Sequence, residues 1–460
     1  MSIFYDEASF VMKCLSRNFC RQPFFSGAKF AVSVTTQILS NNVVLITEPV
    51  ATVKTAAVGF WFPVGSRYEG KNQRGATHFV EHMIFKGTHS RSAFDIALAF
   101  DRIGGYLNAF TDRETMCLHC VVPATHLAKA VEVLVDMCSN SRFDEKELER
   151  ERAVIQSEII SSQDDPEEAA LDAASEAAWP NHPISASIAG TVDEVGSLTR
   201  DTLVDWYKEH IVSGPLVICA AGNVDTRLLQ QMAEILPFRS SCSKDWLKVA
   251  TLNGRQGRAP QWQEGIQFKD APFRQMQFFL QLPVVEPKSD RDYYCWAVAN
   301  ALVGDTMSSR LFQKLREEGG YSYNVYSFMT YYSDAACWCA YASAAKKDSQ
   351  KVVATLYQEL RLLKEKGFSQ DELDAACEHI CGEEIIAAED MDYRSKRLFR
   401  HHSFGFPQTT TQEIADLIHS LSKEEVTSAL HQLLDFDKAT LLVYGNNPTE
   451  SFQKKILAAV

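Results

Sequence analysis

Short apolar runs and longer stretches with one apolar face alternate along this chain, and that alternation predicts an α+β fold. The short runs indicate strands, the longer stretches indicate helices, and Gly, Pro and Asn separate them. The elements expected in the first half are, in order, strands at 43–46 and 56–62, helices within 75–88 and 92–103, two strands within 106–122, helices near 125–140 and 144–163, a helical region at 167–212 with a loop at 180–183, and a closing strand at 216–221.

The same plan returns after residue 264, which indicates a tandem duplication. Three pairs of segments correspond: Gln277–Val284 with the strand that ends at Pro63-Val64, Phe368–Leu373 with Phe143–Leu148, and Thr440–Asn446 with Val217–Asn223. Residues 239–264 are polar and contain Ser, Gly and Pro260, as is typical of a linker. We therefore expect, in order, an N-terminal extension at 1–30, an αβ domain at 31–238, a linker at 239–264, and a homologous αβ domain at 265–460. Each domain should hold a mixed or antiparallel sheet packed with helices.

Length and charge narrow the function classes. A chain of 460 residues exceeds the ~250–300 at which a single core stops growing, which agrees with two domains. The formal net charge of −13 disfavours nucleic acid as a partner and weakly favours basic peptides. No apolar run approaches the ~20 residues of a membrane-spanning helix, so no membrane span is expected.

The cysteines and the first residues bear on the compartment. The 12 cysteines form no evident disulfide framework, and Cys117 and Cys120 lie in a strand-like run where their side chains point to opposite faces. This usage indicates a reducing compartment. Residues 1–30 leave two alternatives open, because their basic residues suggest a targeting segment whereas Asp6 and Glu7 are unusual in a mitochondrial presequence. We expect a cytoplasmic protein of bacterial type, with the mitochondrial matrix as the alternative.

The strongest chemical signal is the sequence His-x-x-Glu-His within 75–88. On a helix, His78 and His82 point to the same side, and Glu81 lies beside them. Two neutral imidazoles one turn apart can occupy two corners of a zinc tetrahedron, and the adjacent carboxylate can accept a proton from water bound there. A solvated helix face is the alternative, but the apolar flanks predict a largely buried helix whose polar groups need partners. This order of residues is the inverzincin signature.

A zinc site needs a third protein ligand, and the best candidates lie in the helix expected at 144–163. Its apolar stripe is expected to comprise Leu148, Val154, Ile155 and Ile159. Glu151 and Glu158 are two turns apart and therefore share a face, whereas the other glutamates are typical of a solvated face.

These motifs resemble those of the pitrilysin/insulinase metallopeptidases, from about residue 31 to the end of the chain. The closest subgroup is that of the mitochondrial processing peptidase beta subunit and its bacterial homologues. The resemblance implies that His78, His82 and Glu158 bind one zinc ion per chain, that Glu81 is the general base, and that Glu151 is a supporting carboxylate. It also implies that the two domains form half of a clamshell.

The second domain lacks His-x-x-Glu-His but carries a different signal. Arg316 lies at the end of an expected helix and Tyr323 at the start of a strand, and both can donate hydrogen bonds to a peptide carbonyl. A helix C-cap Arg and a half-buried strand Tyr are the ordinary alternative. The resemblance implies that Arg316 and Tyr323 reach the zinc site and hold the substrate. Tyr321 is a weaker candidate for the role of Tyr323. Glu383 falls near the place of Glu158 and is expected to be a relic or a surface residue.

The substrate is expected along Asn108, Ala109 and Phe110. The resemblance implies that this strand is an exposed sheet edge to which the substrate adds as an extra strand. From the residues alone, Asn108 could equally be a turn residue next to Gly104-Gly105.

Together these features predict a zinc endopeptidase that hydrolyses unfolded peptides, extended tails or presequences. One alternative is a non-catalytic structural subunit, as in the core proteins of the respiratory cytochrome bc complex. Another is the catalytic subunit of a heterodimeric processing peptidase with an inactive partner chain. Because both motifs are present, a homodimer is favoured.

Overall fold

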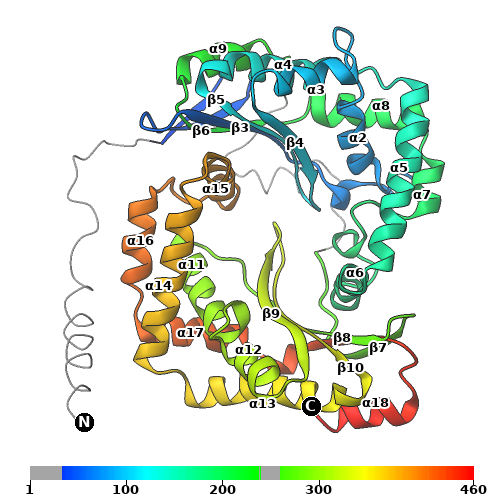
Figure 1. Cartoon of the computed structure of the whole chain (residues 1–460), viewed down its shortest axis with the longest axis vertical. Helices are drawn as coiled ribbons and strands as arrows, with labels where there is room; N and C mark the ends of the chain where they lie inside the picture. The colour runs from blue at the N-terminus through cyan, green and yellow to red at the C-terminus, as the bar shows by residue number, and fades with distance from the viewer. Residues whose placement is uncertain (1–33, 238, 240–258) are drawn as a thin grey trace, which may run out of the picture. The chain divides into compact units, whose positions relative to one another are not determined.

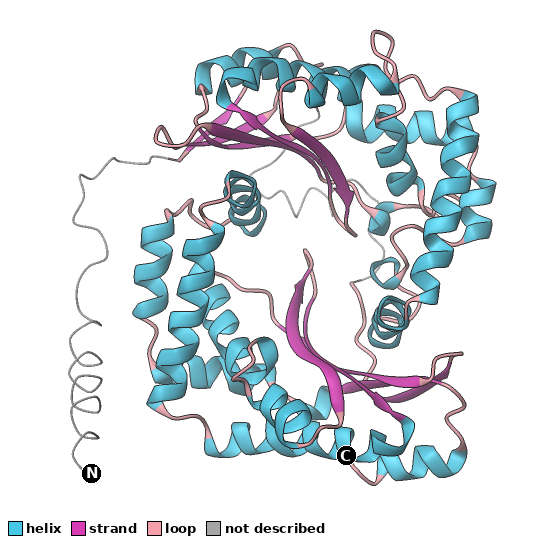
Figure 2. Cartoon of the chain, viewed as in Figure 1, coloured by secondary structure: helices cyan, strands magenta, loops and turns pink. Residues whose placement is uncertain are grey.

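The computed structural model of the chain describes residues 34–237, 239 and 259–460 (Figure 1). The expected extension at 1–30 and most of the expected linker at 239–264 lie outside the described residues. The described part contains two sheets, each with helices gathered on one face (Figure 2). The predicted α+β fold with two similar αβ domains is confirmed.

The first domain holds a six-stranded mixed sheet in the order β1-β2-β6-β3-β5-β4. Only β2 and β6 run parallel, and the other neighbours are antiparallel. Its strands are β1 Thr35–Ile38, β2 Val44–Pro49, β3 Thr55–Phe62, β4 Tyr106–Thr111, β5 Met116–Pro123 and β6 Val217–Gly222. Its helices are α2 Ala76–Ile84, α3 Ala93–Asp101, α4 Leu127–Asn140, α5 Glu145–Asp164, α6 Pro166–Ala178, α7 Val192–Ser197, α8 Arg200–Trp206 and α9 Thr226–Glu234.

The second domain repeats this plan with a five-stranded sheet in the order β7-β11-β8-β10-β9, in which only β7 and β11 run parallel. Its strands are β7 Gly265–Asp270, β8 Gln275–Val284, β9 Ser322–Tyr331, β10 Ala336–Ala345 and β11 Thr440–Gly445. Its helices are α11 Asp290–Asn300, α12 Arg310–Phe312, α13 Ser349–Lys366, α14 Gln370–Ala387, α15 Met391–Phe404, α16 Thr411–His419, α17 Lys423–Leu433 and α18 Glu450–Leu457.

Two details differ from the expectations. Val154 is 49% exposed, so it does not belong to the buried stripe of α5, which consists of Leu148, Glu151, Ile155 and Ile159. In the expected helical region 167–212, α6 ends at Ala178, just before the predicted loop at 180–183. The rest of the region is divided further into α7 and α8, because Thr191 and Thr199 start new helices by accepting hydrogen bonds from backbone amides three residues further on.

The nine cysteines in the described ranges are buried free thiols: Cys117, Cys120, Cys138, Cys219, Cys295, Cys337, Cys339, Cys377 and Cys381. Cys117 and Cys120 pack into different cores on the two faces of the first sheet, as expected. Burial raises the pKa of Cys120 to about 12, so its thiol stays protonated. Among residues 34–237 and 259–460, no helix has the length and apolar character needed to cross a membrane.

Each domain contributes one helix that packs on the sheet of the other domain. Helix α15 of the second domain packs on β2, β3 and β6 of the first sheet, and α6 of the first domain packs on β8 and β11 of the second sheet (Figure 1). At the first contact, Phe399 stacks on Trp61 with ring centroids 3.9 Å apart. At the second, Gln281 Nε2 donates to the carbonyl of Ala174 at 2.9 Å. Each sheet is thus covered on its second face by a helix from the other domain.

A buried ion-pair network reinforces the α15 contact. Glu48 of β2 is fully buried, and its carboxylate lies 2.7 Å from Arg394 Nη1 and 3.0 Å from Arg397 Nη2. Arg397 is itself only 1% exposed and also donates to Thr411 Oγ1 at 2.8 Å. Removing one partner would leave charge in a low-dielectric interior, so this network ties the two domains together.

Arg397→Met should therefore lower the free energy of unfolding by about 3–5 kcal/mol, because Glu48 keeps only Arg394. Urea denaturation followed by far-UV circular dichroism measures this change. The matched control is Lys454→Met, which removes the exposed pair with Glu450, whose side chains are 73% and 82% exposed. The control should leave the unfolding midpoint unchanged, and equal effects of the two substitutions would contradict a buried clamp.

Candidate metal centre

Helix α2 presents His78, Glu81 and His82 on its less buried side. Its opposite side, with Phe79, Val80, Met83 and Ile84, is fully buried in the first core, which fixes the rotation of the helix. The N-cap residue of the helix is Gly75, whose φ is +82°, a conformation that glycine adopts without strain. A Cβ at this position would lie 2.6 Å from the carbonyl oxygen of Ala189, so the close approach of that loop also requires glycine.

Helix α5 brings two glutamates to the same place. Glu158 Oε2 lies 3.5 Å from His82 Nε2 and 3.9 Å from His78 Nε2. One ligand atom from each of His78, His82 and Glu158 lies within 4.8 Å of the others. Two imidazoles and one carboxylate form the donor set of catalytic zinc sites that keep an open position.

The state of His78 also fits a metal ligand. Burial, with a smaller contribution from the neighbouring His82, lowers the pKa of His78 to about 4, so the ring is neutral near pH 7. Its Nδ1 is buried and has no hydrogen-bond partner in the part of the chain that the structure describes. A neutral imidazole is the form that binds a metal ion.

Glu151 orients His82 from the other side of the ring. Glu151 Oε2 lies 3.0 Å from His82 Nδ1, and Oε1 lies 2.7 Å from Lys86 Nζ. Since Nδ1 is engaged there, Nε2 is left to face Glu158. A carboxylate on the second nitrogen of a ligating histidine fixes its tautomer and orientation.

Glu81 is partly buried and accepts a hydrogen bond from Thr111 Oγ1, at the end of β4. Burial raises the pKa of Glu81 above its ordinary value, while the Thr111 hydroxyl and His82 partly offset the increase. Thr111 was not among the site residues predicted from the sequence. The signal that could have found it is the alternation of β4, which places Thr111 on the same face as the buried Ala109 and hence toward α2.

The expected substrate strand is indeed a sheet edge. β4 pairs only with β5 in the sheet order, and Asn108 is exposed in mid-strand opposite His119, not in a turn. The Oδ1 of Asn108 accepts from the amide of Ala109 at 2.9 Å. The side chain of Ala109 is buried, and the ring of Phe110 packs against that of Trp61 with ring centroids 5.5 Å apart.

Arg316 and Tyr323 lie together, apart from the candidate zinc ligands on α2 and α5. The Arg316 guanidinium lies 4.7 Å from the centroid of the Tyr323 ring and 4.9 Å from that of Phe312. Tyr323 is 74% exposed, so the half-buried alternative is wrong. The short helix that carries Arg316, Gln313–Glu318, packs on α13 and β9, whereas α2 packs on α5, α8 and β4.

The other residues singled out in the second domain have local partners. Tyr321 packs against the second core beneath Lys351. Glu383 lies on α14 with a 59% exposed side chain, and its Oε1 is 3.2 Å from His379 Nε2. Neither residue contacts the cluster on α2 and α5.

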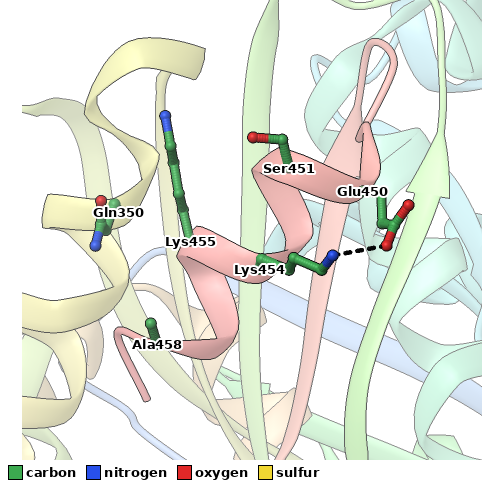
Figure 3. Close-up of a pocket in the computed structure, with 6 residues that line it drawn as sticks. All are labelled: Gln350, Glu450, Ser451, Lys454, Lys455 and Ala458. Carbon is green, nitrogen blue, oxygen red and sulfur yellow. Dashed lines mark ion pairs between the residues drawn. The ribbon is translucent and has the colours of Figure 1, made fainter.

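A surface pocket lies elsewhere in the second domain, between α18 and the start of α13 (Figure 3). Its lining comprises Gln350, Glu450, Ser451, Lys454, Lys455 and Ala458. Glu450 and Lys454 pair across one helix turn at 2.8 Å. Its lining contains no imidazole, thiol or buried carboxylate, and the candidate site is the cluster on α2 and α5.

Comparison with known proteins agrees with this geometry. The insulinase (peptidase family M16) model matches residues 43–192, and the peptidase M16 inactive-domain model matches residues 197–379. The chain is 30% identical over 413 residues to the uncharacterized zinc protease YmxG of Bacillus subtilis, covering 89% of this chain and 98% of that protein. The chain belongs to the insulinase family, peptidase family M16.

Solved structures support the fold. A peptidase M16 inactive-domain protein from Pseudomonas fluorescens superimposes with a TM-score of 0.81 at 16% identity, covering 90% of this chain and 98% of that chain. A chain of complex III2 from Candida albicans superimposes with a TM-score of 0.75 at 17% identity, covering 93% and 100%. The M16 fold therefore extends over both domains of this chain.

The contact between Glu81 and Thr111 generates a prediction. Thr111→Val removes the hydroxyl that stabilises the ionised carboxylate, so the pKa of Glu81 should rise further. The measurement is a carboxyl ¹³C NMR titration of the metal-free chain, with the Glu81 signal assigned by its loss in Glu81→Gln. Thr111→Ser keeps the hydroxyl and should leave the titration unchanged. A pKa in Thr111→Val equal to or below that of the parent chain would contradict the role of this hydrogen bond.

Proposed function

We propose that this chain is a zinc-dependent endopeptidase, with His78, His82 and Glu158 as the zinc ligands. The observation that carries the proposal is the convergence of these three side chains, with Glu81 beside them on the same helix. The names of relatives, such as the zinc protease of Bacillus subtilis, support the same class of enzyme. A zinc ion held there supplies Lewis acidity, which polarises a peptide carbonyl and lowers the pKa of water.

Glu81 is the proposed general base. Its raised pKa lies closer to neutral pH than that of an ordinary glutamate, which suits a group that must both accept and return a proton. Glu81 takes a proton from the attacking water and then delivers it to the leaving amine. Glu151 does not touch the reacting atoms and acts by holding His82 in place.

The proposed substrate is an unfolded peptide or an extended tail or presequence of a protein. Because β4 is an edge strand, its free N–H and C=O groups can pair with an extended chain at Asn108, Ala109 and Phe110. Such pairing recognises the backbone more than side chains. A folded domain offers no free strand of this kind, so folded proteins should resist cleavage.

Arg316 and Tyr323 are proposed to hold the substrate carbonyl, as a pair contributed by a second copy of the chain. The two domains of one chain are tied by Glu48 with Arg394 and Arg397 and by the packing of α6 and α15, so they do not swing freely to bring the pair to α2. The exposed position of Tyr323 leaves it available to another molecule. A homodimer would then contain two complete sites.

The alternative is a non-catalytic structural subunit, and the likeness to a complex III2 chain concerns the fold alone. A structural subunit has no need for a partly buried base beside three convergent ligands. A heterodimer with an inactive homologous chain is the other alternative, and the presence of both motifs in one chain favours the homodimer.

The first test separates ligand from base. Glu81→Gln should abolish turnover and retain about one zinc per chain, because it removes the proton acceptor and no ligand. Glu158→Gln should lose zinc. Metal analysis after gel filtration and digestion of an unfolded peptide measure both quantities. Equal zinc contents in the two variants would refute the assignment, and a parent chain with zinc but no activity on unfolded peptides would favour the structural subunit.

The second test concerns Arg316. Arg316→Ala should keep its zinc and lose on the order of 10²-fold in turnover, as loss of an oxyanion donor does elsewhere. Mixing equal amounts of Arg316→Ala and Glu81→Gln under conditions of subunit exchange should restore activity to about a quarter of the parent level, because half of the dimers then hold one intact site. A mixture no more active than the average of the two variants would mean that the pair acts within its own chain or not at all.

A further inference from the structure

The N-terminus of α2 is capped by a carboxylate from outside the helix. Glu69 is 4% exposed, and its two oxygens accept hydrogen bonds from two backbone amides, Gly75 N and Thr77 N, each at 2.8 Å. These amides belong to the cap and the second residue of α2, which have no partners within a helix. Gly75 has no side chain with which to cap them, so Glu69 replaces the usual Ser, Asp or Asn.

The ligands lie close to this end. α2 has nine residues, with His78 third and His82 seventh, so the first turn already contains one ligand. A short helix frays from its ends, and the register of its first turn depends on which amides are held there. Fixing the amides on either side of Ala76 therefore fixes where His78 points.

Glu69 is kept at an energetic cost. Burial raises the pKa of Glu69 to about 7, and the hydrogen bonds from Thr77 and Gly75 together with Arg74 offset only part of the increase. An apolar or amide side chain would fill the same space without the cost of burying a charge. Only a carboxylate has two oxygens that can accept hydrogen bonds from both backbone amides at once, and the apolar and amide side chains lack this pair of acceptors.

The segment that carries Glu69 is anchored to both domains through Arg67. The nearby Arg67 donates its amide to the carbonyl of Arg113 at 2.9 Å, in the turn between β4 and β5. The Arg67 guanidinium bonds Glu114 of the same turn and Asp334 of the second domain, each at 2.6 Å. The cap is thus supplied by a segment whose own position is fixed independently of α2.

We propose that Glu69 is a positioning residue for the metal centre: by accepting both N-terminal amides of α2 it sets the register of His78 and His82. This inference rests on the proposed function in taking these two histidines as zinc ligands. The hydrogen bonds of Glu69 go to backbone amides of α2 and not to the side chains of the three proposed ligands, so its effect acts through the helix.

The test measures zinc affinity by competition with a chromophoric chelator on the full chain. Glu69→Ala should weaken zinc binding by about 10- to 100-fold, as loss of a supporting group at a metal site does. Glu69→Gln should weaken it by a smaller factor, because one oxygen still accepts while the amide group faces an N–H, and it serves if Glu69→Ala does not fold. The matched control is Asp225→Ala. Asp225 caps another nine-residue helix, α9, by accepting the amides of Arg227 and Leu228 at 2.9 and 3.2 Å.

Asp225→Ala should lower stability without changing zinc affinity. Hydrogen exchange of the metal-free chain should show faster exchange in α2 for Glu69→Ala and in α9 for Asp225→Ala. Parent-like zinc affinity in both Glu69 variants would overturn the inference, as would equal weakening by Asp225→Ala. A parent chain that binds no zinc would overturn the proposed function as well, so the two failures are distinguishable.

Discussion

The contact between α2 and α5 is the constraint on which the metal centre depends. His82 lies between two carboxylates of α5, with Glu151 3.0 Å from Nδ1 and Glu158 3.5 Å from Nε2. Glu151 is nearly buried, and a buried carboxylate is tolerated only with good partners, here His82 and Lys86. The spacing of Glu151 and Glu158, two turns of one helix, therefore lets a single packing contact bring both the proposed ligand Glu158 and the group that orients His82.

In the described residues of the duplicated domain, the same plan occurs without a convergent group of metal-binding side chains. α14 corresponds to α5, and its buried Glu384 is satisfied by protein groups: the Tyr393 hydroxyl donates at 2.7 Å, the Tyr294 hydroxyl at 3.3 Å, and Arg400 lies at 3.4 Å. The buried carboxylate of Glu384 is therefore stabilised by neighbouring side chains. The second domain is consequently free to contribute packing through α15 and an exposed Arg–Tyr pair.

Local features of the site could be predicted from the sequence, and long-range ones could not. The His-x-x-Glu-His spacing and the two-turn spacing of Glu151 and Glu158 follow from helix periodicity within each helix. The pairing of His78 and His82 with Glu158 of the other helix was implied only by the resemblance to the family. Thr111 and Glu69 depend on which segments fold against α2, and neither the residue type nor its spacing indicates that. The packing of α6 and α15 on the sheet of the other domain could not be predicted for the same reason. Both are amphipathic helices, and an apolar helix face does not specify which sheet it covers.

The strand that would receive the substrate also tunes the base. Thr111 is the last residue of β4, and its hydrogen bond to Glu81 lowers the pKa of that carboxyl, which offsets part of the increase caused by burial. A peptide paired along Asn108 to Phe110 would exclude water from this end of the strand and deepen the burial of Glu81, which favours its protonated form. The Thr111 hydroxyl opposes that shift at the same moment, because its hydrogen bond strengthens as the local dielectric falls. In the proposed enzyme, substrate binding and the protonation state of Glu81 would thus be linked through one backbone strand, and a hydrogen bond already in place would offset the effect of enclosing the site.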